Sequence, residues 1–168
     1  MNLIAVAAMT EDRLVAHEAG VPWHHPEDVR QYKRRVADAP VIVGRTTYEG
    51  MRPDPPGRRQ VVLSRSVSAY PEATASVVDG VEAAIETATA TGAETTYVIG
   101  GAEVYEAFLP HYDRMVLTIV ADEVDPTSGA RFFPAWDRSA WTRTRTDDAE
   151  GFRIEHWVRT DQSSTDQA

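Results

Sequence analysis

The segment that most constrains the fold is an apolar run that ends in two glycines and leads directly into a helical pattern. The run TTYVIGG at 95–101 is apolar enough for a buried strand, and AEVYEAFLP at 102–110 has helical spacing up to Pro110. A strand followed at once by a helix is the repeating unit of α/β folds. Gly100 and Gly101 would let a ligand approach the backbone closely, although a bare glycine pair is as often only a turn.

The rest of the chain repeats this alternation before its pattern changes. Further buried strands are predicted at 2–9, 41–44 and 59–64, and helices at 27–38, 46–51 and 81–92. Alternating apolar and polar residues, typical of antiparallel strands, follow at 114–122, 139–146 and 151–160. We therefore predict an α/β fold with a mixed, mostly parallel sheet flanked by helices and a C-terminal antiparallel hairpin. One domain is expected over 1–160, and the polar segment 161–168 is expected to be disordered.

The charge balance excludes several classes of partner. Lys and Arg number 17, with Lys33 the single lysine, against 26 Asp and Glu, and the formal net charge of −9 repels nucleic acid and anionic membranes. No run approaches the ~18 apolar residues of a membrane span, and the N-terminal segment lacks the basic start of a signal peptide. Without cysteine there is no disulfide or thiolate metal site. We expect a cytoplasmic protein that binds a small molecule, with no nucleic-acid or membrane partner.

Two strand ends carry residues suited to phosphate. VGRTT places Arg45, Thr46 and Thr47 after one predicted strand, and VLSRS places Ser64 and Arg65 after another. Ligands of α/β sheets bind at the carboxyl ends of parallel strands, where a cation, hydroxyls and free backbone N–H groups can hold an anion. A single loop arginine is usually only solvated, but two such strand ends together indicate a diphosphate or phosphorylated ribose site.

The segment VPWHHPEDVRQYKRR places a carboxylate beside aromatic residues. Trp23 lies in a stiff loop between two prolines, and Asp28 falls in the first turn of the following helix. Asp28 could simply favour the helix N-terminus electrostatically. An apolar surround from Trp23, Val29 and Tyr32 would instead suit it to acid chemistry or to pairing with a cationic ligand. The five histidines show no metal-ligand spacing, so we expect no metal site, and we expect His24 and His25 to lie on a solvated loop.

Together these segments resemble the dihydrofolate reductase family from about residue 2 to 159. The resemblance is carried by LIAVAA at 3–8, PWxxPxD at 22–28, PVIVGRTTYE at 40–49, PPGR at 55–58, VVLSRS at 61–66, VIGGAEVYEAFLP at 98–110 and LT at 117–118. The acidic, lysine-poor composition is similar to the halophilic archaeal branch. The resemblance implies NADPH-dependent reduction of 7,8-dihydrofolate to 5,6,7,8-tetrahydrofolate, with hydride added at pterin C6 and a proton at N5.

Two other functions compete with this one. A riboflavin-pathway-type pyrimidine reductase shares the fold and NADPH use, but PWxxPxD argues against it because its substrate is not a pterin. A non-catalytic nucleotide-binding protein would be favoured by loss of Asp28 or Trp23, and both residues are present.

The resemblance also implies roles for individual residues at the substrate site. Asp28 would hydrogen-bond the amino-pyrimidine edge of the pterin and assist protonation at N5, while Trp23 and Thr118 hold the water and hydrogen-bond network around it. The pocket would be lined by Val6, Ala8, Tyr32 and Met51. Arg58 would bind the α-carboxylate of the glutamate tail, although Pro55 replaces the leucine that is usual in the adjoining wall.

For the cofactor, the resemblance implies NADPH. Ala8 and the loop from Leu14 and Val15 to Gly20 would meet the nicotinamide, although Val15-Ala16 stands where Ile-Gly is usual. The adenosine and its 2′-phosphate would be held by Arg45, Thr46, Thr47, Ser64 and Arg65, and the diphosphate by Gly100 and Gly101, expected to be joined by a cis peptide, with Ala102, Glu103, Val104 and Tyr105. Glu103 stands where many members place a cation. We expect a monomer.

The acid excess has two explanations that differ in their salt dependence. If it is an adaptation to strong salt, the Tm should climb steadily from dilute buffer to molar KCl as self-repulsion is screened. If it reflects only a GC-rich genome that encodes Arg over Lys, the Tm should reach a plateau by about 0.2 M, where the Debye length is already below ~8 Å. Thermal unfolding across a KCl series measures which holds.

Overall fold

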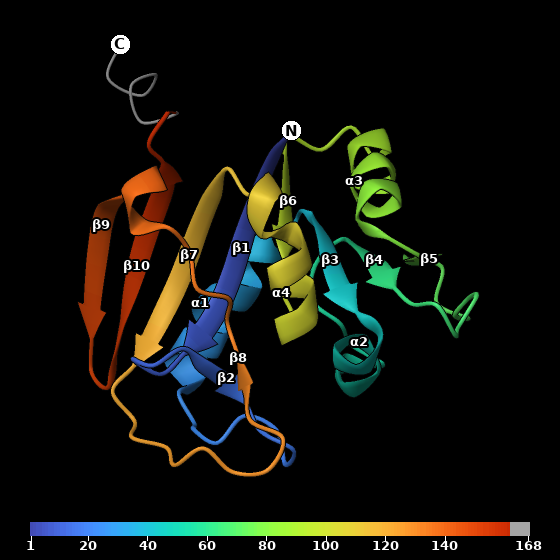
Figure 1. The fold of residues 1–168 in the computed structure, drawn as a ribbon. Helices are drawn as coiled ribbons and strands as arrows, with labels where there is room; N and C mark the ends of the chain where they lie inside the picture. The colour runs from blue at the N-terminus through green and yellow to red at the C-terminus, as the bar shows by residue number, and fades with distance from the viewer. Residues whose placement is uncertain (162–168) are drawn as a thin grey trace.

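The computed structural model describes residues 1–161. Apart from residue 161, the tail expected to be disordered, 161–168, lies outside the described residues. The strands of its main sheet are β1 (Asn2–Met9), β3 (Pro40–Gly44), β4 (Arg59–Leu63), β5 (Ala75–Val78), β6 (Thr95–Val98), β7 (Arg114–Val120), β9 (Trp141–Ala149) and β10 (Phe152–Arg159). They lie side by side in the order β5-β4-β3-β6-β1-β7-β10-β9 (Figure 1). A separate small sheet pairs β2 (Leu14–Ala16) with β8 (Arg131–Phe132).

The strand directions confirm the predicted mixed sheet. Every pairing from β5 through β7 is parallel, whereas β10 pairs antiparallel with both β7 and β9. Parallel neighbours need crossover connections, and helices supply most of them.

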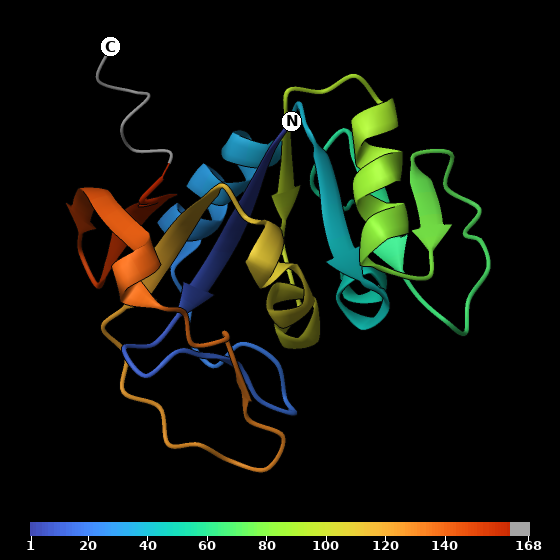
Figure 2. The ribbon, with the colours of Figure 1, turned by 45° about the horizontal axis from the view of Figure 1, so that its top comes forward.

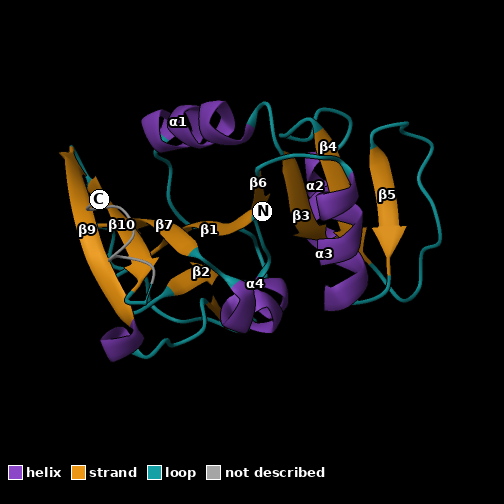
Figure 3. Cartoon of the chain, turned by 90° about the horizontal axis from the view of Figure 1, so that it is seen from above, coloured by secondary structure: helices purple, strands orange, loops and turns teal. Residues whose placement is uncertain are grey.

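Within residues 1–161, four α-helices cover the two faces of the sheet. They are α1 (Pro26–Val36), α2 (Arg45–Met51), α3 (Val81–Ala90) and α4 (Ala102–Phe108), with 3-10 turns η1 (Leu109–His111) and η2 (Arg138–Ala140). α1 lies on one face, and α3 and α4 lie on the other, as the tilted view in Figure 2 and the view from above in Figure 3 show. None of the helices in the described part of the chain has the length and apolarity needed to cross a membrane.

Both faces of the central strand β1 are buried, and its residues alternate between two cores. Leu3, Ala5, Ala7 and Met9 pack in the core beneath α3 and α4, whereas Ile4 and Val6 pack in the core beneath α1. The two-residue period of a strand requires this division, and burial on both faces explains why β1 reads as a continuous apolar run. The same period directs Ala8 toward the α1 side of the sheet.

The strand order has a switch point at the carboxyl ends of β1 and β6, and the space beyond these two ends is called the crevice, as in other open α/β sheets. After β1 the chain crosses to α1 on one face, whereas after β6 it passes into α4 on the other face. β1 and β6 are hydrogen-bonded neighbours, so the connections leave their carboxyl ends in opposite directions. Such a switch point is where ligands bind in open α/β sheets. Ala8, near the end of β1, and the glycine pair that follows β6 lie at this switch point.

The short elements differ from the sequence-based expectations. β2, β5 and β8 were not expected, and the strand predicted at 95–101 ends at Val98, before the glycines. The strand predicted at 139–146 begins at Trp141 and continues to Ala149, because it pairs with β10 along its whole length.

Candidate active site

Asp28 is buried at the start of α1 and is held from two elements. Its exposed fraction is 7%, and its Oδ1 accepts hydrogen bonds from Thr118 Oγ1 on β7 at 2.6 Å and from Gln31 Nε2 at 2.8 Å. Both donors contact the same oxygen, so Oδ2 keeps its acceptor capacity within the described residues. A carboxylate with one oxygen fixed and one available can accept a donor from a ligand without leaving its own site.

Thr118 faces Asp28 because of its register in the sheet. Met115, Leu117 and Ile119 on β7 pack in the core beneath α3 and α4, so Val116 and Thr118 face α1. Thr118 pairs with Ala8 on β1, which places Ala8 beside the Asp28–Thr118 hydrogen bond.

The expected walls of the substrate pocket gather on the same face. Val6, Tyr32 and Met51 all contact the core beneath α1. Burial raises the pKa of the Tyr32 phenol well above its ordinary value, so the ring stays neutral. Val29, which we expected to shield Asp28, is instead 46% exposed, because it lies one position further around the helix. Trp23 is partly exposed in the loop before α1.

The second group of expected residues meets where β3 and β6 end. Gly44 N–H donates to Gly100 O at 2.8 Å, and the Gly100–Gly101 peptide is cis, as expected. A Cβ at Gly101 would lie 3.3 Å from Thr47 Oγ1, and one at Gly44 would lie 3.1 Å from Val104 Cγ2. The glycines therefore bring the starts of α2 and α4 together, with bare backbone and the first N–H groups of α4 available to an anionic diphosphate. The residues fit that group of a nicotinamide cofactor.

Gly100 also has a reason to lack a side chain inside the protein. Its φ is +119°, and a Cβ there would lie 3.2 Å from the Tyr105 hydroxyl. Burial raises the pKa of Tyr105 strongly, so its hydroxyl stays protonated and donates to Val6 O at 2.7 Å. Tyr105 thus links α4 to β1 beneath the crevice.

The expected phosphate ligands follow neighbouring strands, but two of them already have partners. Gly44 and Leu63, the last residues of β3 and β4, are register partners. Arg45 and Ser64, which follow them, therefore begin at the same end of neighbouring strands. Arg45 Nη1 lies 3.0 Å from Glu49 Oε2, and Ser64 Oγ accepts the N–H groups of Ser66 and Val67. Of the remaining members, Thr46 and Arg65 are exposed and Thr47 is partly exposed. Glu103 is exposed and Ala102 partly so.

The loop expected to meet the nicotinamide is partly ordered by the small sheet. Leu14 is 1% exposed, so its side chain points into the protein, and Val15 is partly buried against the core beneath α3 and α4. The end of the loop, from residue 18 to Gly20, is exposed. Leu14 pairs with Phe132, and the φ of Gly20 is +103°.

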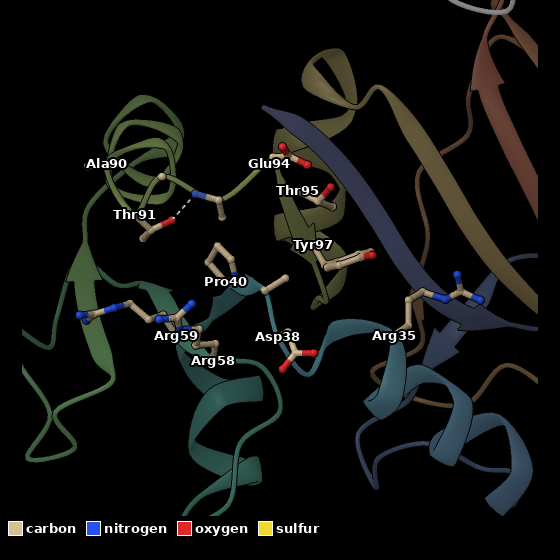
Figure 4. Close-up of a pocket in the computed structure, with 13 residues that line it drawn as sticks. Arg35, Asp38, Pro40, Arg58, Arg59, Ala90, Thr91, Glu94, Thr95 and Tyr97 are labelled. Carbon is tan, nitrogen blue, oxygen red and sulfur yellow. Dashed lines mark hydrogen bonds between the residues drawn. The ribbon is translucent and has the colours of Figure 1, made fainter. Parts of the chain in front are cut away.

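Arg58 lies near the amino ends of the parallel strands, whereas the crevice lies at their carboxyl ends. It lines a cavity of about 690 Å³ at the amino ends of β3, β4 and β6, together with Arg59, Pro40 and Tyr97. Figure 4 shows Arg58 and Arg59 on one side of this cavity and Arg35 extending away from them. The cavity does not include Asp28, so a ligand that reached both Asp28 and Arg58 would have to extend along α1.

The sequence-based expectations did not include the contacts of Gln31, Gly44 and His25. Gln31 lies three residues after Asp28 on one helix, a spacing that could have identified it. Gly44 gave no local signal of its approach to Gly100. The expectation that His25 is solvated is wrong, because its Nε2 lies 2.6 Å from Asp122 Oδ1, a residue 97 positions away.

Comparison with known proteins gives a consistent result. The family model described as dihydrofolate reductase matches residues 2–158. Dihydrofolate reductase HdrB of Haloferax volcanii is 37% identical over 99% of this chain and 88% of its own length. Dihydrofolate reductase 1 of Haloarcula marismortui is 35% identical over 91% of this chain and 89% of its own, and dihydrofolate reductase of Neisseria meningitidis is 36% identical over 84% of each.

The fold, the cis glycine pair at the crevice and these similarities agree: this chain belongs to the dihydrofolate reductase family.

Proposed function

We propose that this protein catalyses the NADPH-dependent reduction of 7,8-dihydrofolate to 5,6,7,8-tetrahydrofolate. The observation that carries the proposal is the buried Asp28 carboxylate, fixed through Oδ1 by Thr118 beside the crevice between β1 and β6. A pterin presents adjacent N–H donors on its amino-pyrimidine edge, and a carboxylate is their natural acceptor. The described surroundings of Asp28 offer no competing cation: its hydrogen bonds come from a hydroxyl and an amide.

The protein would act mainly by orientation and by handling one proton. Asp28 would hold the pterin edge, and Thr118 would keep the carboxylate from rotating, so that N5 lies in a fixed position relative to Ala8. Trp23 would hold a water for protonation at N5. Restricting the reactants in this way lowers the entropic part of the barrier.

The bound nicotinamide cofactor supplies the hydride. Gly100, Gly101 and the start of α4 would hold its diphosphate, and Ala8 with the loop from Val15 to Gly20 would face the nicotinamide. Arg45 and Arg65, at the ends of adjacent strands, would bind the 2′-phosphate that distinguishes NADPH from NADH. In binding, the phosphate would compete with Glu49 for Arg45.

We further propose a cytoplasmic monomer adapted to strong salt. The net charge of −9 with one lysine supports salt adaptation, as does the halophilic source of the two archaeal relatives.

Replacing Asp28 tests the assignment of the proton-handling group. Asp28→Asn keeps the size of the side chain but removes the ionisable group, so kcat near neutral pH should fall by ~10²–10⁴. The variant should regain rate as pH drops, because bulk acid can then protonate dihydrofolate before hydride transfer. Steady-state oxidation of NADPH across a pH series measures both effects.

The control for Asp28 is its neighbour. Glu27 is exposed and pairs with Arg30, so Glu27→Gln should change neither kcat nor its pH dependence. An unchanged pH–rate profile for Asp28→Asn would leave Asp28 with only a helix-terminus role.

Replacing Arg45 and Arg65 by Ala tests cofactor selection. Charge-assisted hydrogen bonds contribute ~1.5–3 kcal/mol each, and Arg45 must leave Glu49, so we expect a loss of about 2–4 kcal/mol in NADPH binding. That loss is a rise in Kd of about 30- to 700-fold, with NADH changed less than about threefold. Arg34→Ala with Arg145→Ala changes net charge equally and controls for long-range attraction. Equal losses for NADPH and NADH would contradict the assignment.

Replacing Arg58 tests the substrate tail. Arg58→Ala should raise KM for dihydrofolate by roughly tenfold or more with little change in kcat, because the contact is similar in ground and transition states. Arg58→Lys should recover little, since lysine cannot bind a carboxylate through two parallel hydrogen bonds. Steady-state kinetics of both variants, with Arg59→Ala as the neighbouring control, measure this, and an unchanged KM would remove Arg58 from the site.

A further inference from the structure

His25 precedes α1 and is held between two segments from the far part of the chain. Its side chain is 18% exposed, and its Nε2 lies 2.6 Å from Asp122 Oδ1, just after β7. A carboxylate only accepts, so the imidazole N–H donates. On its other side the ring meets Phe152 edge-on, with the centroids 5.6 Å apart.

The turn between β9 and β10 leaves room for this ring by a missing side chain. A Cβ at Gly151 would lie 2.9 Å from His25 Cε1, and the φ of Gly151 is +84°. Gly151 O also accepts the N–H of Ala121, next to Asp122. The ring is therefore enclosed by the end of β7 and by the following hairpin, which are themselves hydrogen-bonded together.

The His25 side chain bonds to Asp122 and not to the backbone of its own helix. It occupies the N-cap position of α1 and makes no side-chain cap hydrogen bond, although that position favours residues that do. Its carbonyl accepts the N–H of Val29, so the His25 backbone belongs to the first turn, which also contains Asp28. Fixing His25 consequently fixes where that turn begins.

Two anchors join the start of α1 to β7 and the residues that follow it. Asp28–Thr118 is the inner anchor, and His25–Asp122 is the outer one. Packing of Tyr32 and Val36 holds the later turns of α1, and the two hydrogen bonds restrain its start at two positions, Asp28 and His25. Trp23, two residues before His25, lies on the same restrained segment.

We propose that His25 and Asp122 form a positioning pair for catalysis, which orients the segment from Trp23 to Asp28 against β7. This inference rests on the proposed roles of Asp28 and Trp23. The pair itself contacts neither substrate nor cofactor in this proposal. It acts by positioning Asp28. Removing it should loosen the pterin pocket and leave the cofactor site, at the starts of α2 and α4, unchanged.

Single variants and their controls test the pair directly. His25→Ala and Asp122→Ala should each lower kcat by about tenfold and raise KM for dihydrofolate, since displacing a catalytic group by ~1 Å costs up to 10²-fold. The Kd of NADPH should stay within about twofold. The double variant should be no worse than either single one, because both remove the same hydrogen bond. His25→Gln and Asp122→Asn, which can keep a hydrogen bond, should recover most of the rate, and His24→Ala, at an exposed neighbour, should have no effect.

The Asp28→Asn background separates positioning from general stability. In that background His25→Ala should lower the remaining kcat by less than about twofold, because Asp28 no longer supplies the group that is being positioned. Asp28→Asn alone tests the proposed function, so its failure is distinguishable from failure of this pair. An equal kcat loss in both backgrounds, a parallel loss of NADPH affinity, or no loss at all would overturn the proposal. If His25→Ala does not fold, Asp122→Ala, which leaves the sequence of α1 unchanged, gives the same comparison between the two backgrounds.

Discussion

A parallel strand buried on both faces must receive its hydrogen bonds from neighbours that arrive by crossovers, and β1 imposes this constraint on the whole molecule. β6 enters the sheet between β3 and β1, and β7 pairs with the other edge of β1. The crossovers must use both faces, because β1 has an apolar surface on each. The crevice between the ends of β1 and β6 follows from that arrangement, so the ligand site is a consequence of how the core is covered.

Within this frame the sequence predicted the elements with strong local patterns. β1 and the run from β6 into α4 are continuous apolar segments with clear ends, and the cis Gly100–Gly101 peptide was expected through family resemblance. β2, β5 and β8 have two to four residues, too few to show a period, and exist because a partner strand is present. The strand order was not predicted, since apolar periodicity does not say which strands are neighbours.

The contacts of the candidate site also divide into local ones, which the sequence can indicate, and long-range ones, which it cannot. Gln31 beside Asp28 and Glu49 beside Arg45 lie three and four residues apart on helices, so the sequence contains both pairs. Asp28 and Thr118 are 90 residues apart, and His25 and Asp122 are 97 apart, so only the folded chain reveals them. The residues whose chemistry matters most here are supported by partners that no local pattern could indicate.

The position of β10 in the sheet determines the order in which the contacts of Asp28 and His25 can form during synthesis. A chain leaves the ribosome from its N-terminus, and domains fold as their residues emerge. Asp28 emerges early but must wait for Thr118, and His25 must wait longer still for Gly151 and Phe152, which belong to the last hairpin of the described chain. A nascent chain that has completed the parallel strands could form the Asp28–Thr118 hydrogen bond but would lack the hairpin that encloses His25. A fully enclosed His25, and with it the proposed positioning of Asp28, would then require β10 to be in place beside β7.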